Sequence, residues 1–316
     1  MPLSIDVIIP TYRPDEKYVQ LLEMLKKQVY PVHQIIVINT EAKYYKEETY
    51  PVLDNLKVVH IAKADFDHGG TRNMAVQMSD SDIVLLMTQD AVPADVYLTK
   101  YMADCFADDT VASVYARQLP AADCNLIERY TRQFNYPDKS FVKSAAQKSQ
   151  LGIKTYFCSD VCAAYRRSVY EALGGFPLHT IFNEDMIYAA SVIESGYSIA
   201  YCAQAQVIHS HNYTGRQQFH RNFDNAVAQS DYKEIFADLP AEGEGIRMVK
   251  ATAKYLLKQG KWYLLPKLVF VSGCKYAGFF LGKRYEKLPS ALVKICTMDK
   301  GYWVKNGRFS ENGRCS

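Results

Sequence analysis

The sequence lacks the features that mark several special classes of protein. Its 8 cysteines include no C-x-x-C pair, which argues against a zinc cage or a disulfide framework. The N-terminal segment MPLSIDVIIPTYRP has neither a basic region nor a long apolar stretch, so we expect no secretory signal and a reduced, cytosolic setting. We find no internal repeat and no low-complexity segment. The cysteines are Cys105, Cys124, Cys158, Cys162, Cys202, Cys274, Cys296 and Cys315.

Composition places the chain among ordinary globular proteins. Hydrophobic residues make up 48% of the 316 residues and charged residues 22%, which excludes disordered, collagen-like and coiled-coil classes. A chain of this length buries a full core, and it fits one large α/β domain with a C-terminal appendage. Tyrosine is abundant, at 24 residues, and indicates amphipathic contact surfaces.

The net charge of +3 conceals a strong asymmetry along the chain. Residues 246–316 carry 15 lysines and arginines against 3 acidic residues, a net charge of +12. Residues 1–245 carry a net charge of −9. A basic tail of this kind suggests contact with an anionic surface, either a membrane or a nucleic acid.

Apolar runs alternate with helical patterns over the first 120 residues. Short β-rich runs predict strands, and apolar residues at helical spacing predict helices between them. This alternation is typical of βαβ units and a mostly parallel sheet, with all-apolar runs such as IVLLM at its centre. We therefore expect an α/β fold whose first 120 residues form a nucleotide-binding half. The expected strands cover residues 5–9, 34–38, 57–61 and 83–87, and the helices cover 15–27 and 71–78.

The middle segment, residues 121–230, is less regular and richer in aromatic residues. In the sequence LGGFP, Gly174 is expected to end a short helix in a left-handed conformation. Another helix is expected over Asn183–Glu194, with acidic residues near its positive N-terminal end.

Polar clusters follow four of the expected strands. In open α/β sheets, ligands bind beyond the carboxyl ends of the strands, so these clusters are candidates for one shared binding site. The alternative is that each cluster is a loop with ordinary turn chemistry. The clusters are Thr11-Tyr12-Arg13, Asn39-Thr40-Glu41, Asp65 to Asn73, and Thr88-Gln89-Asp90.

The segment DHGGTRN places two glycines before an expected helix. Gly69 and Gly70 would allow a ligand to approach the backbone closely, and the free N–H groups of the helix N-terminus favour an anion. Arg72 would add a charge-assisted contact to a phosphate oxygen. The pattern is neither a P-loop nor G-x-G-x-x-G, and a glycine pair before a helix also occurs in ordinary loops.

Asp90 follows the most hydrophobic of the expected strands. A carboxylate there requires a cation, and a Mg²⁺ ion shared with pyrophosphate oxygens would supply one. The alternative is that Asp90 caps the helix expected over residues 94–105. His209 and His211 lie two apart in an expected strand, a spacing that directs both to one face and suits metal ligands. A purely structural role for both histidines is the alternative.

Glu184 and Asp185 follow a loop flanked by Phe176 and Phe182. A carboxylate near an apolar wall has a raised pKa and is suited to act as a general base. The alternative is that the pair only complements the dipole of the helix whose first turn it occupies.

Taken in order, the motifs IIPTYRP, QIIVINT, HGGTRN, LLMTQDAVP, CAAYRR, LGGFP, NED and HSHNY resemble those of inverting family 2 glycosyltransferases of GT-A fold. Within that family, DFDHGGTRN and TQDA resemble the rhamnosyltransferase branch. The resemblance extends over residues 3–230. It implies a GT-A fold, with a Rossmann-like nucleotide-binding part and a mostly parallel central sheet. It also implies transfer of a sugar from a nucleotide-sugar with inversion.

The resemblance assigns roles residue by residue. Asp185 matches the catalytic base of the family's E-D pair, with Glu184 as the next candidate. Ser159 and Asp160 are expected to contact the sugar or the acceptor. Thr88-Gln89-Asp90 occupies the D-x-D position and keeps only its last carboxylate. The residues expected around the nucleotide-sugar are Pro10, Thr11, Tyr12, Arg13, Asn39, Asp65, Gly69, Arg72, Asn73, Gln89 and Asp90.

Two departures from the family pattern bear on the chemistry. Loss of the first aspartate of D-x-D weakens two-carboxylate metal binding, so Mg²⁺ or Mn²⁺ would rely on Asp90 together with His209 and His211. Asn39 replaces the aspartate that contacts the base in many relatives, which fits a nucleotide other than the commonest uridine type.

We therefore expect a metal-assisted transfer of L-rhamnose from dTDP-L-rhamnose to a glycan or lipid-linked saccharide acceptor. The same chemistry with a UDP-hexose or a UDP-N-acetylhexosamine is the alternative. A nucleotidyltransferase would need a glycine-rich loop after the first strand, and PTYRP has none. A nucleic-acid-binding module would interleave basic residues with exposed aromatics around a groove. The basic residues of the tail instead share one helix face, so we expect no nucleic acid partner.

The expected organisation is a GT-A catalytic domain over residues 1–235, followed by a basic helical region over 236–316. Within the catalytic domain, residues 1–120 would bind the nucleotide-sugar and residues 121–235 the acceptor.

The C-terminal region begins with an amphipathic helical pattern. Its basic residues recur at three- and four-residue steps beside an apolar face, which favours peripheral attachment to an anionic membrane surface on the cytoplasmic side. The alternative is that the helices pack on the catalytic domain or in a homodimer. The basic residues are Arg247, Lys250, Lys254, Lys258 and Lys261, and the apolar ones are Ile246, Val249, Ala253, Leu256 and Leu257.

An apolar stretch over residues 262–281 follows this pattern. It is interrupted by Pro266, Lys267, Gly273 and Lys275. A spanning helix needs about 20 predominantly apolar residues, so we expect this stretch to be a poor transmembrane helix.

Overall fold

The computed structural model describes residues 2–237, 242–305 and 307, and these residues form two compact units. The first unit contains the residues up to Cys124 together with Arg132–Leu178 and Glu184–Ser210. The second contains Asn125–Thr131, His179–Asn183 and the described residues from His211 onwards. All the strands that the structure describes belong to the first unit.

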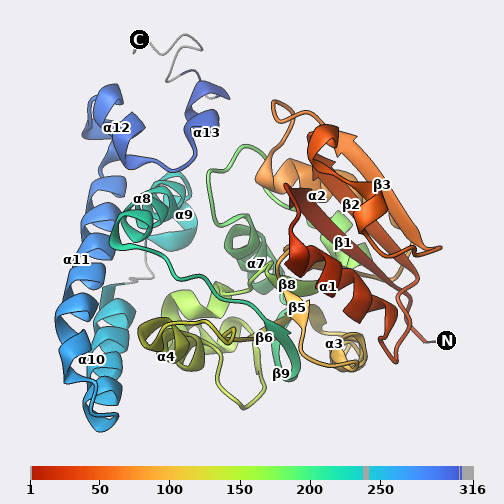
Figure 1. Ribbon diagram of the computed structural model, residues 1–316, viewed down its shortest axis with the longest axis horizontal. Coiled ribbons are helices and arrows are strands. Elements are labelled where there is room, and N and C mark those ends of the chain that lie inside the picture. Colours follow the sequence, from red (N-terminus) through yellow and green to blue (C-terminus); the bar gives the residue numbers. More distant parts are fainter. Residues whose placement is uncertain (1, 238–241, 306, 308–316) are drawn as a thin grey trace. The chain divides into compact units, whose positions relative to one another are not determined.

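A nine-stranded sheet forms the centre of the first unit, and its first half is parallel (Figure 1). This half contains β1 (Ile5–Tyr12), β2 (Gln34–Thr40), β3 (Leu56–Ile61) and β4 (Ile83–Met87). β1 lies between β2 and β4, and β3 extends the sheet beyond β2. All three pairings are parallel, so the βαβ alternation predicted from the sequence is confirmed.

The second half of the sheet is mixed. It contains β5 (Val92–Pro93), β6 (Val111–Leu119), β7 (Phe141–Lys143), β8 (Cys162–Arg166) and β9 (Ser198–Ile208). β8 pairs antiparallel with β4 and β6, and β9 runs parallel to β6. β5 and β7 pair antiparallel with β9. The expected parallel arrangement is complete over β1–β4, and beyond it the sheet becomes mixed because β8 reverses the strand direction.

The alternation of side chains along the central strands creates two apolar faces. Ile5, Val7 and Ile9 of β1 point to one face, where they share a buried core with Leu21 and Leu22 of α1 (Glu16–Lys26). α3 (Leu98–Cys105) contributes to the same core. The central strands are buried on both faces, which is why their sequences are continuously apolar.

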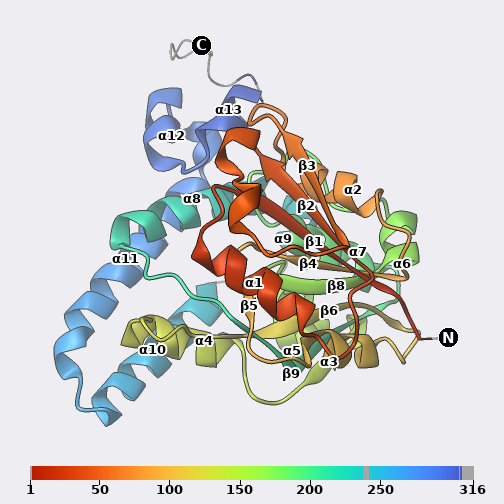
Figure 2. The ribbon, with the colours of Figure 1, turned by 45° about the vertical axis from the view of Figure 1, so that its right-hand side comes forward.

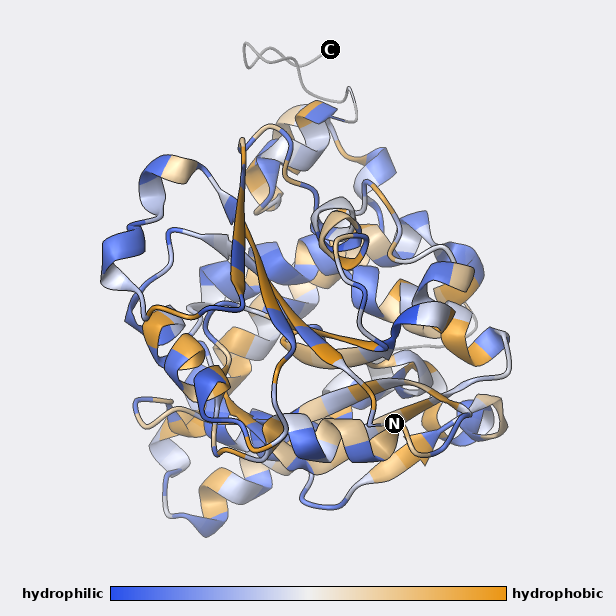
Figure 3. Ribbon diagram, turned by 90° about the vertical axis from the view of Figure 1, so that its right-hand side faces the viewer, coloured by the Kyte–Doolittle hydropathy of each residue, from blue (hydrophilic) through white to orange (hydrophobic). Residues whose placement is uncertain are grey.

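The helices on the other face are α2 (His68–Val76), α6 (Arg167–Ala172) and α7 (Glu184–Glu194). Figure 2 shows α1 and α3 on one side of the sheet and these three helices on the other. Figure 3, coloured by hydropathy, shows predominantly apolar central strands and helices that carry both apolar and polar residues. The first unit is therefore a three-layer α/β structure.

Most of the predicted helices are present, with shifted boundaries. Asp15 caps α1, its carboxylate accepting a hydrogen bond from the amide of Lys17. α2 begins three residues earlier than the range 71–78 predicts. α6 ends before Gly174, whose φ of +83° confirms the predicted left-handed conformation. Two further helices are α4 (Leu126–Asn135) and α5 (Lys148–Leu151).

The second unit is helical. It contains α8 (Gly215–Asp231), α9 (Lys233–Phe236), α10 (Glu242–Lys258), α11 (Leu265–Gly282), α12 (Ser290–Cys296) and α13 (Lys300–Lys305). Its buried core includes Phe223 and Val227 of α8, Val293 of α12 and Trp303 of α13. The helical C-terminal appendage predicted from the sequence is confirmed, although residues 238–241, 306 and 308–316 lie outside the described part of the chain.

α11 and α8 pack with their backbones in close contact. A Cβ atom at Gly278 would lie 2.1 Å from the carbonyl oxygen of Phe219, and one at Gly282 would lie 2.3 Å from that of Phe223. The spacing of four residues places both glycines on the same face of α11. Glycine is therefore required at both positions by the approach of α8.

The interruptions expected in the apolar stretch over residues 262–281 do not break the helix that it forms. Pro266 lies in the first turn of α11, where its missing N–H group leaves no helical hydrogen bond unmade, and the helix continues through Gly273. The segment Trp262–Gly282 is long and apolar enough to cross a membrane by length and composition alone. Helices of soluble proteins also satisfy this criterion.

Candidate functional site

The carboxyl ends of β1, β2 and β4 bring three of the predicted polar clusters together. The Thr11 hydroxyl donates to the Asn39 side-chain oxygen at 3.1 Å. The Gln89 side chain accepts from the amide of Tyr12 at 2.8 Å and donates to its carbonyl at 3.2 Å. Because Gln89 uses its amide group on the backbone of β1, it fixes the end of that strand beside Asp90.

Asn39 is fully buried, and its carboxamide is used inside the protein. The amide nitrogen donates to the carbonyl of Glu41 and contacts Nδ1 of His60, at 3.2 and 3.0 Å. Together with the bond from Thr11, these contacts hold the ends of three strands in register. A direct contact between Asn39 and a nucleotide base requires a rearrangement of this network.

Arg13, beside this network, occupies a left-handed conformation with a φ of +51°. Its guanidinium lies over the ring of Tyr44 and donates to the Tyr44 hydroxyl at 2.8 Å. An open hollow of about 510 Å³ borders this pair, and Lys43 and Lys46 also line it. The hollow touches the segment predicted to bind the nucleotide and not the acidic residues described below.

The start of α2 differs from the sequence prediction. Gly69 and Gly70 lie inside the first turn of the helix, and the carboxylate of Asp67 caps it by accepting from the amide of Gly70 at 2.7 Å. A Cβ atom at Gly69 would lie 2.0 Å from the carbonyl oxygen of Pro177. Close packing against this loop, rather than approach of a ligand, therefore explains the glycine at position 69. Asp65 lies exposed in the preceding loop.

The side chain of Asn73 is also used in hydrogen bonds within the protein. Its side-chain oxygen accepts from the amide of Phe176 at 3.0 Å and from the Tyr170 hydroxyl at 2.5 Å, and its nitrogen donates to the carbonyl of Phe176 at 2.9 Å. Gly175, at a φ of +70°, lets the loop pass close to Asn73. These contacts fix the 174–177 loop on α2.

Arg72 lies in the middle of a buried acidic cluster. Its Nε atom is 3.2 Å from a carboxylate oxygen of Asp160, and its Nη1 atom is 3.2 Å from one of Glu184. Nη1 also donates to the carbonyl of His68 at 2.8 Å. The guanidinium therefore lies against carboxylates in this structure, and its contact with a phosphate oxygen stays a prediction.

Asp185 joins the same cluster from the first turn of α7. Its carboxylate accepts from the amide of Asp160 at 3.2 Å and from that of Met186 at 2.7 Å. Asp185 is half-buried, whereas Asp160 and Glu184 are buried. Of the three residues, Asp185 is thus the most exposed.

The cluster contains more carboxylates than nearby guanidinium groups. This excess of carboxylates affects the pKa values of Asp160 and Asp185. Burial, together with the neighbouring charges of Asp160 and Glu184, raises the pKa of Asp185 well above its usual range. Burial also raises the pKa of Asp160 to about 7, even though Arg72 opposes the shift. The site therefore contains one carboxyl group, Asp160, with a pKa near neutrality, and a second, Asp185, with a pKa above the usual carboxyl range.

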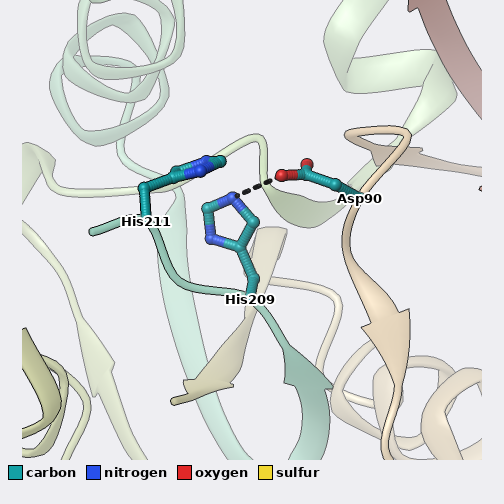
Figure 4. Close-up of side chains that lie close together, drawn as sticks. All are labelled: Asp90, His209 and His211. Carbon is teal, nitrogen blue, oxygen red and sulfur yellow. Dashed lines mark ion pairs between the residues drawn. The ribbon is translucent and has the colours of Figure 1, made fainter. Parts of the chain in front are cut away.

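Asp90, His209 and His211 form a second group of ionisable side chains (Figure 4). Their ligand atoms lie within 4.8 Å of one another, and Nε2 of His209 is 3.5 Å from a carboxylate oxygen of Asp90. β9 ends at Ile208, so the expectation that both histidines lie in a strand is wrong. The chain that leaves the strand carries His211 two residues after His209. One carboxylate and two imidazoles are a donor set that fits a divalent transition metal.

Asp90 does not cap α3, which was the alternative role considered for it. α3 begins only at Leu98, and Tyr97 occupies the capping position. The carboxylate of Asp95 accepts from the amide of Tyr97 at 2.8 Å. Asp90 is therefore left in the loop that faces His209.

The fold of this chain is shared with solved glycosyltransferase structures. A mannosyltransferase from Pyrobaculum calidifontis, in complex with GDP-Man and Mn²⁺, superposes with a TM-score of 0.55 over 97% of this chain and 84% of its own, at 16% identity. TarS 1–349 from S. aureus superposes with a TM-score of 0.51 over 90% of this chain and 91% of its own, at 14% identity. At these identities the likeness establishes the fold alone, and that fold is GT-A.

Sequence comparison decides the family. The model of glycosyl transferase family 2 matches residues 6–174. The O-antigen chain rhamnosyltransferase RfbN of Salmonella typhimurium is 42% identical over 306 residues, which cover 95% of this chain and 96% of the relative. The O-antigen chain rhamnosyltransferase WbaN of Salmonella anatum is 40% identical over 303 residues, with 95% and 96% coverage. The chain belongs to glycosyl transferase family 2. The protein is therefore an inverting glycosyltransferase, as the motifs implied.

Sequence reasoning missed some buried residues that organise the site of this glycosyltransferase. Gln118, at the end of β6, contacts both His209 and Ser159. Tyr165 donates from its hydroxyl to the carboxylate of Asp160. The run VASVYARQL over residues 111–119 could have revealed Gln118, because it is an apolar strand that ends in a polar side chain.

Proposed function

We propose that this glycosyltransferase transfers L-rhamnose from dTDP-L-rhamnose to a growing cell-surface glycan. The observation that carries the proposal is the 42% and 40% identity, over 95% of the chain, to two O-antigen chain rhamnosyltransferases.

Asp185 is the general base in this proposal. It would take the proton from the acceptor hydroxyl as that oxygen attacks the anomeric carbon opposite the diphosphate. The base has to come within about 2.6–3.2 Å of the hydroxyl in the productive complex. Its half-buried position and its raised pKa support the assignment. Glu184 is the next candidate, but it is more buried and already paired with Arg72.

Asp90, His209 and His211 are the residues that would hold a divalent metal. Imidazole ligands suit Mn²⁺ better than Mg²⁺, so we propose Mn²⁺ as the preferred ion. Such an ion would stabilise the charge that develops on the departing diphosphate. Gln89, which fixes the end of β1, would keep Asp90 next to the nucleotide.

The donor proposal is tested by a thermal-shift and calorimetric screen of dTDP, UDP and GDP, each with Mn²⁺, with Mg²⁺ and with chelator. We expect dTDP with Mn²⁺ to give the largest stabilisation, because only binding to the folded state raises the melting temperature. A preference for UDP would favour transfer from a UDP-sugar. A preference for GDP, or no response to any nucleotide, would contradict the proposal.

We also propose that the enzyme works at the anionic cytoplasmic face of the membrane, where a lipid-linked saccharide acceptor would lie. Arg247, Lys250, Lys254 and Lys258 are exposed on α10. Each lysine or arginine near such a surface contributes about 1 kcal/mol of attraction. The net charge of +12 over residues 246–316 favours an anionic partner and disfavours a second copy of the same basic region.

The outward face of α11 supports the same proposal. Val269 and Tyr276 of α11 and Trp262, in the turn before it, recur every seven residues and are 68%, 63% and 68% exposed. The opposite face of α11 packs on α8, which carries charged residues such as Arg216 and Arg221 along its length. Because α8 could not accompany α11 into hydrocarbon, we propose that α11 lies in the membrane plane and does not span it.

Co-sedimentation with vesicles tests the membrane proposal. We expect binding to anionic vesicles at low salt, weaker binding at high salt, and little binding to neutral vesicles. The variant with Val269→Asp and Tyr276→Asp should lose most of this binding, whereas Val52→Asp, at another exposed valine, should keep it. If the wild-type protein stays in the supernatant at low salt, and sedimentation analysis shows a dimer, the same face serves as a subunit interface instead.

A further inference from the structure

The buried side chain of Gln118 contacts both His209, a proposed metal ligand, and Ser159, which precedes Asp160 of the acidic cluster. The side chain lies at the end of β6 and is 2% exposed. Its oxygen accepts hydrogen bonds from Nδ1 of His209, at 3.1 Å, and from Nη1 of Arg132. Its nitrogen donates to the Ser159 hydroxyl at 3.1 Å. All of these residues belong to the first unit.

Arg132 determines which way the carboxamide of Gln118 points. A guanidinium has only donors, so the atom of Gln118 that faces it has to be the oxygen. The same oxygen faces Nδ1 of His209. That ring nitrogen therefore carries a hydrogen, and in the neutral imidazole the lone pair lies on Nε2.

The lone pair of Nε2 is directed at Asp90, whose nearer carboxylate oxygen is 3.5 Å away. A neutral imidazole nitrogen and a carboxylate oxygen are both acceptors, so they need a cation or a proton between them. Metal–ligand distances of about 2.0–2.2 Å place two neighbouring ligands of one ion roughly 3 Å or slightly more apart. The observed separation fits two ligands of one ion.

We propose that Gln118 is a positioning residue for the metal: it fixes the tautomer and the ring orientation of His209 so that Nε2 is presented to the ion. This inference rests on the proposed metal group. Hydrogen-bond partners of ligating histidines commonly have this task, and their loss typically weakens metal affinity by 10–100-fold. Through Ser159, which precedes Asp160, Gln118 also ties the metal group to the acidic cluster.

The test compares two variants of Gln118 in the full-length protein. Gln118→Met keeps the shape but removes the acceptor, so we expect Mn²⁺ affinity to fall by about 10–100-fold. Gln118→Glu keeps an acceptor for His209 and Arg132, so we expect its affinity to stay close to that of the wild type. Gln206→Met, in the neighbouring strand β9, is the matched control and should bind Mn²⁺ normally. Electron paramagnetic resonance of free Mn²⁺ measures the affinity, and the melting temperature shows whether each variant folds.

A second measurement tests the tautomer without any metal. Nitrogen-15 chemical shifts of labelled histidine, assigned with His209→Gln, should show His209 protonated at Nδ1 in the wild type and redistributed toward Nε2 in Gln118→Met. A His209 protonated at Nε2 in the wild type, or unchanged Mn²⁺ affinity in a folded Gln118→Met variant, would overturn the proposal. If the wild type binds no Mn²⁺ while His209 shows the expected tautomer, the metal assignment fails and the role of Gln118 in orienting His209 stands.

Discussion

At the scale of single residues, Asp185 differs from its acidic neighbours in combining a raised pKa with partial exposure. We expect Asp185→Asn to lower sugar transfer by at least ~10²-fold, the usual scale of general-base loss. Nucleotide binding should be unchanged, because Asp185 is expected to contact the acceptor and not the donor. Initial rates with a saccharide acceptor, together with calorimetry of dTDP binding, measure the two effects.

The pH profile provides a second check on the same residue. A base has to be deprotonated to work, so transfer should rise with pH through a pKa above the usual carboxyl range. This rise should be absent from the residual activity of Asp185→Asn. Retained turnover in a folded Asp185→Asn variant would place the base elsewhere, with Glu184→Gln the next variant to make.

Lys143 is a buried cation whose stability contribution depends on pH. It is 1% exposed, and its ammonium donates to the carbonyls of Lys154 and Phe157. Burial lowers its pKa to about 7 from the usual 10.5. Between pH values of about 7 and 10.5, the unfolded chain binds more protons at this lysine than the folded protein does. The contribution of Lys143 to the free energy of unfolding therefore rises with pH across this range and is lost as pH falls.

We therefore expect Lys143→Met to flatten the pH dependence of stability above neutrality. One differentially bound proton gives a slope of up to about 1.4 kcal/mol per pH unit. Urea unfolding of the wild type and the variant at pH 7, 8 and 9 measures the difference in slope. Equal slopes in the two proteins would show that Lys143 does not titrate in this range.

At the scale of secondary-structure elements, the contact between α8 and α11 depends on glycine. A Cβ atom at Gly278 would meet the backbone of Phe219, which cannot move without displacing α8. We expect Gly278→Ala to cost about 1–3 kcal/mol of unfolding free energy, as overpacking does elsewhere. Denaturant unfolding measures this loss.

Gly273 provides a matched control on the same helix. A Cβ atom there would have no neighbour within 4 Å among the described residues. Gly273→Ala should therefore be neutral or stabilising by up to about 1 kcal/mol, because alanine is the better helix former. Equal effects of the two substitutions would mean that α8 and α11 do not approach each other as described.

At the scale of the whole molecule, apolar cores and not disulfide bonds stabilise the described part of the chain. Each unit has its own buried core, and the seven cysteines within the described residues are free thiols, while Cys315 lies outside them. We expect the melting temperature to be the same with and without a reducing agent. A lower melting temperature in reductant, with fewer titratable thiols in the denatured protein, would reveal a disulfide and contradict this prediction.

Local patterns in the sequence determined the elements of the fold. Short β-rich runs predicted β1–β4, and apolar residues at helical spacing predicted α1, because both signals depend on neighbouring residues only. The order of the motifs also led to the family, which the comparisons confirm. The division into a catalytic domain up to residue 235 and a helical region from 236 stays a prediction, as do the roles of the site residues.

Only the tertiary structure decided what the side chains of the site contact. Arg72 faces Asp160 and Glu184 rather than open solvent, and Asn73 binds the loop at Phe176. Gln118 and His209 meet although 91 residues separate them. Such contacts depend on how β6, β8 and β9 are ordered in the sheet, and no local pattern encodes that order. The sequence determined which residues could carry the chemistry. The packing of distant segments decided which of these residues lie together, and which have their polar groups occupied by contacts within the protein.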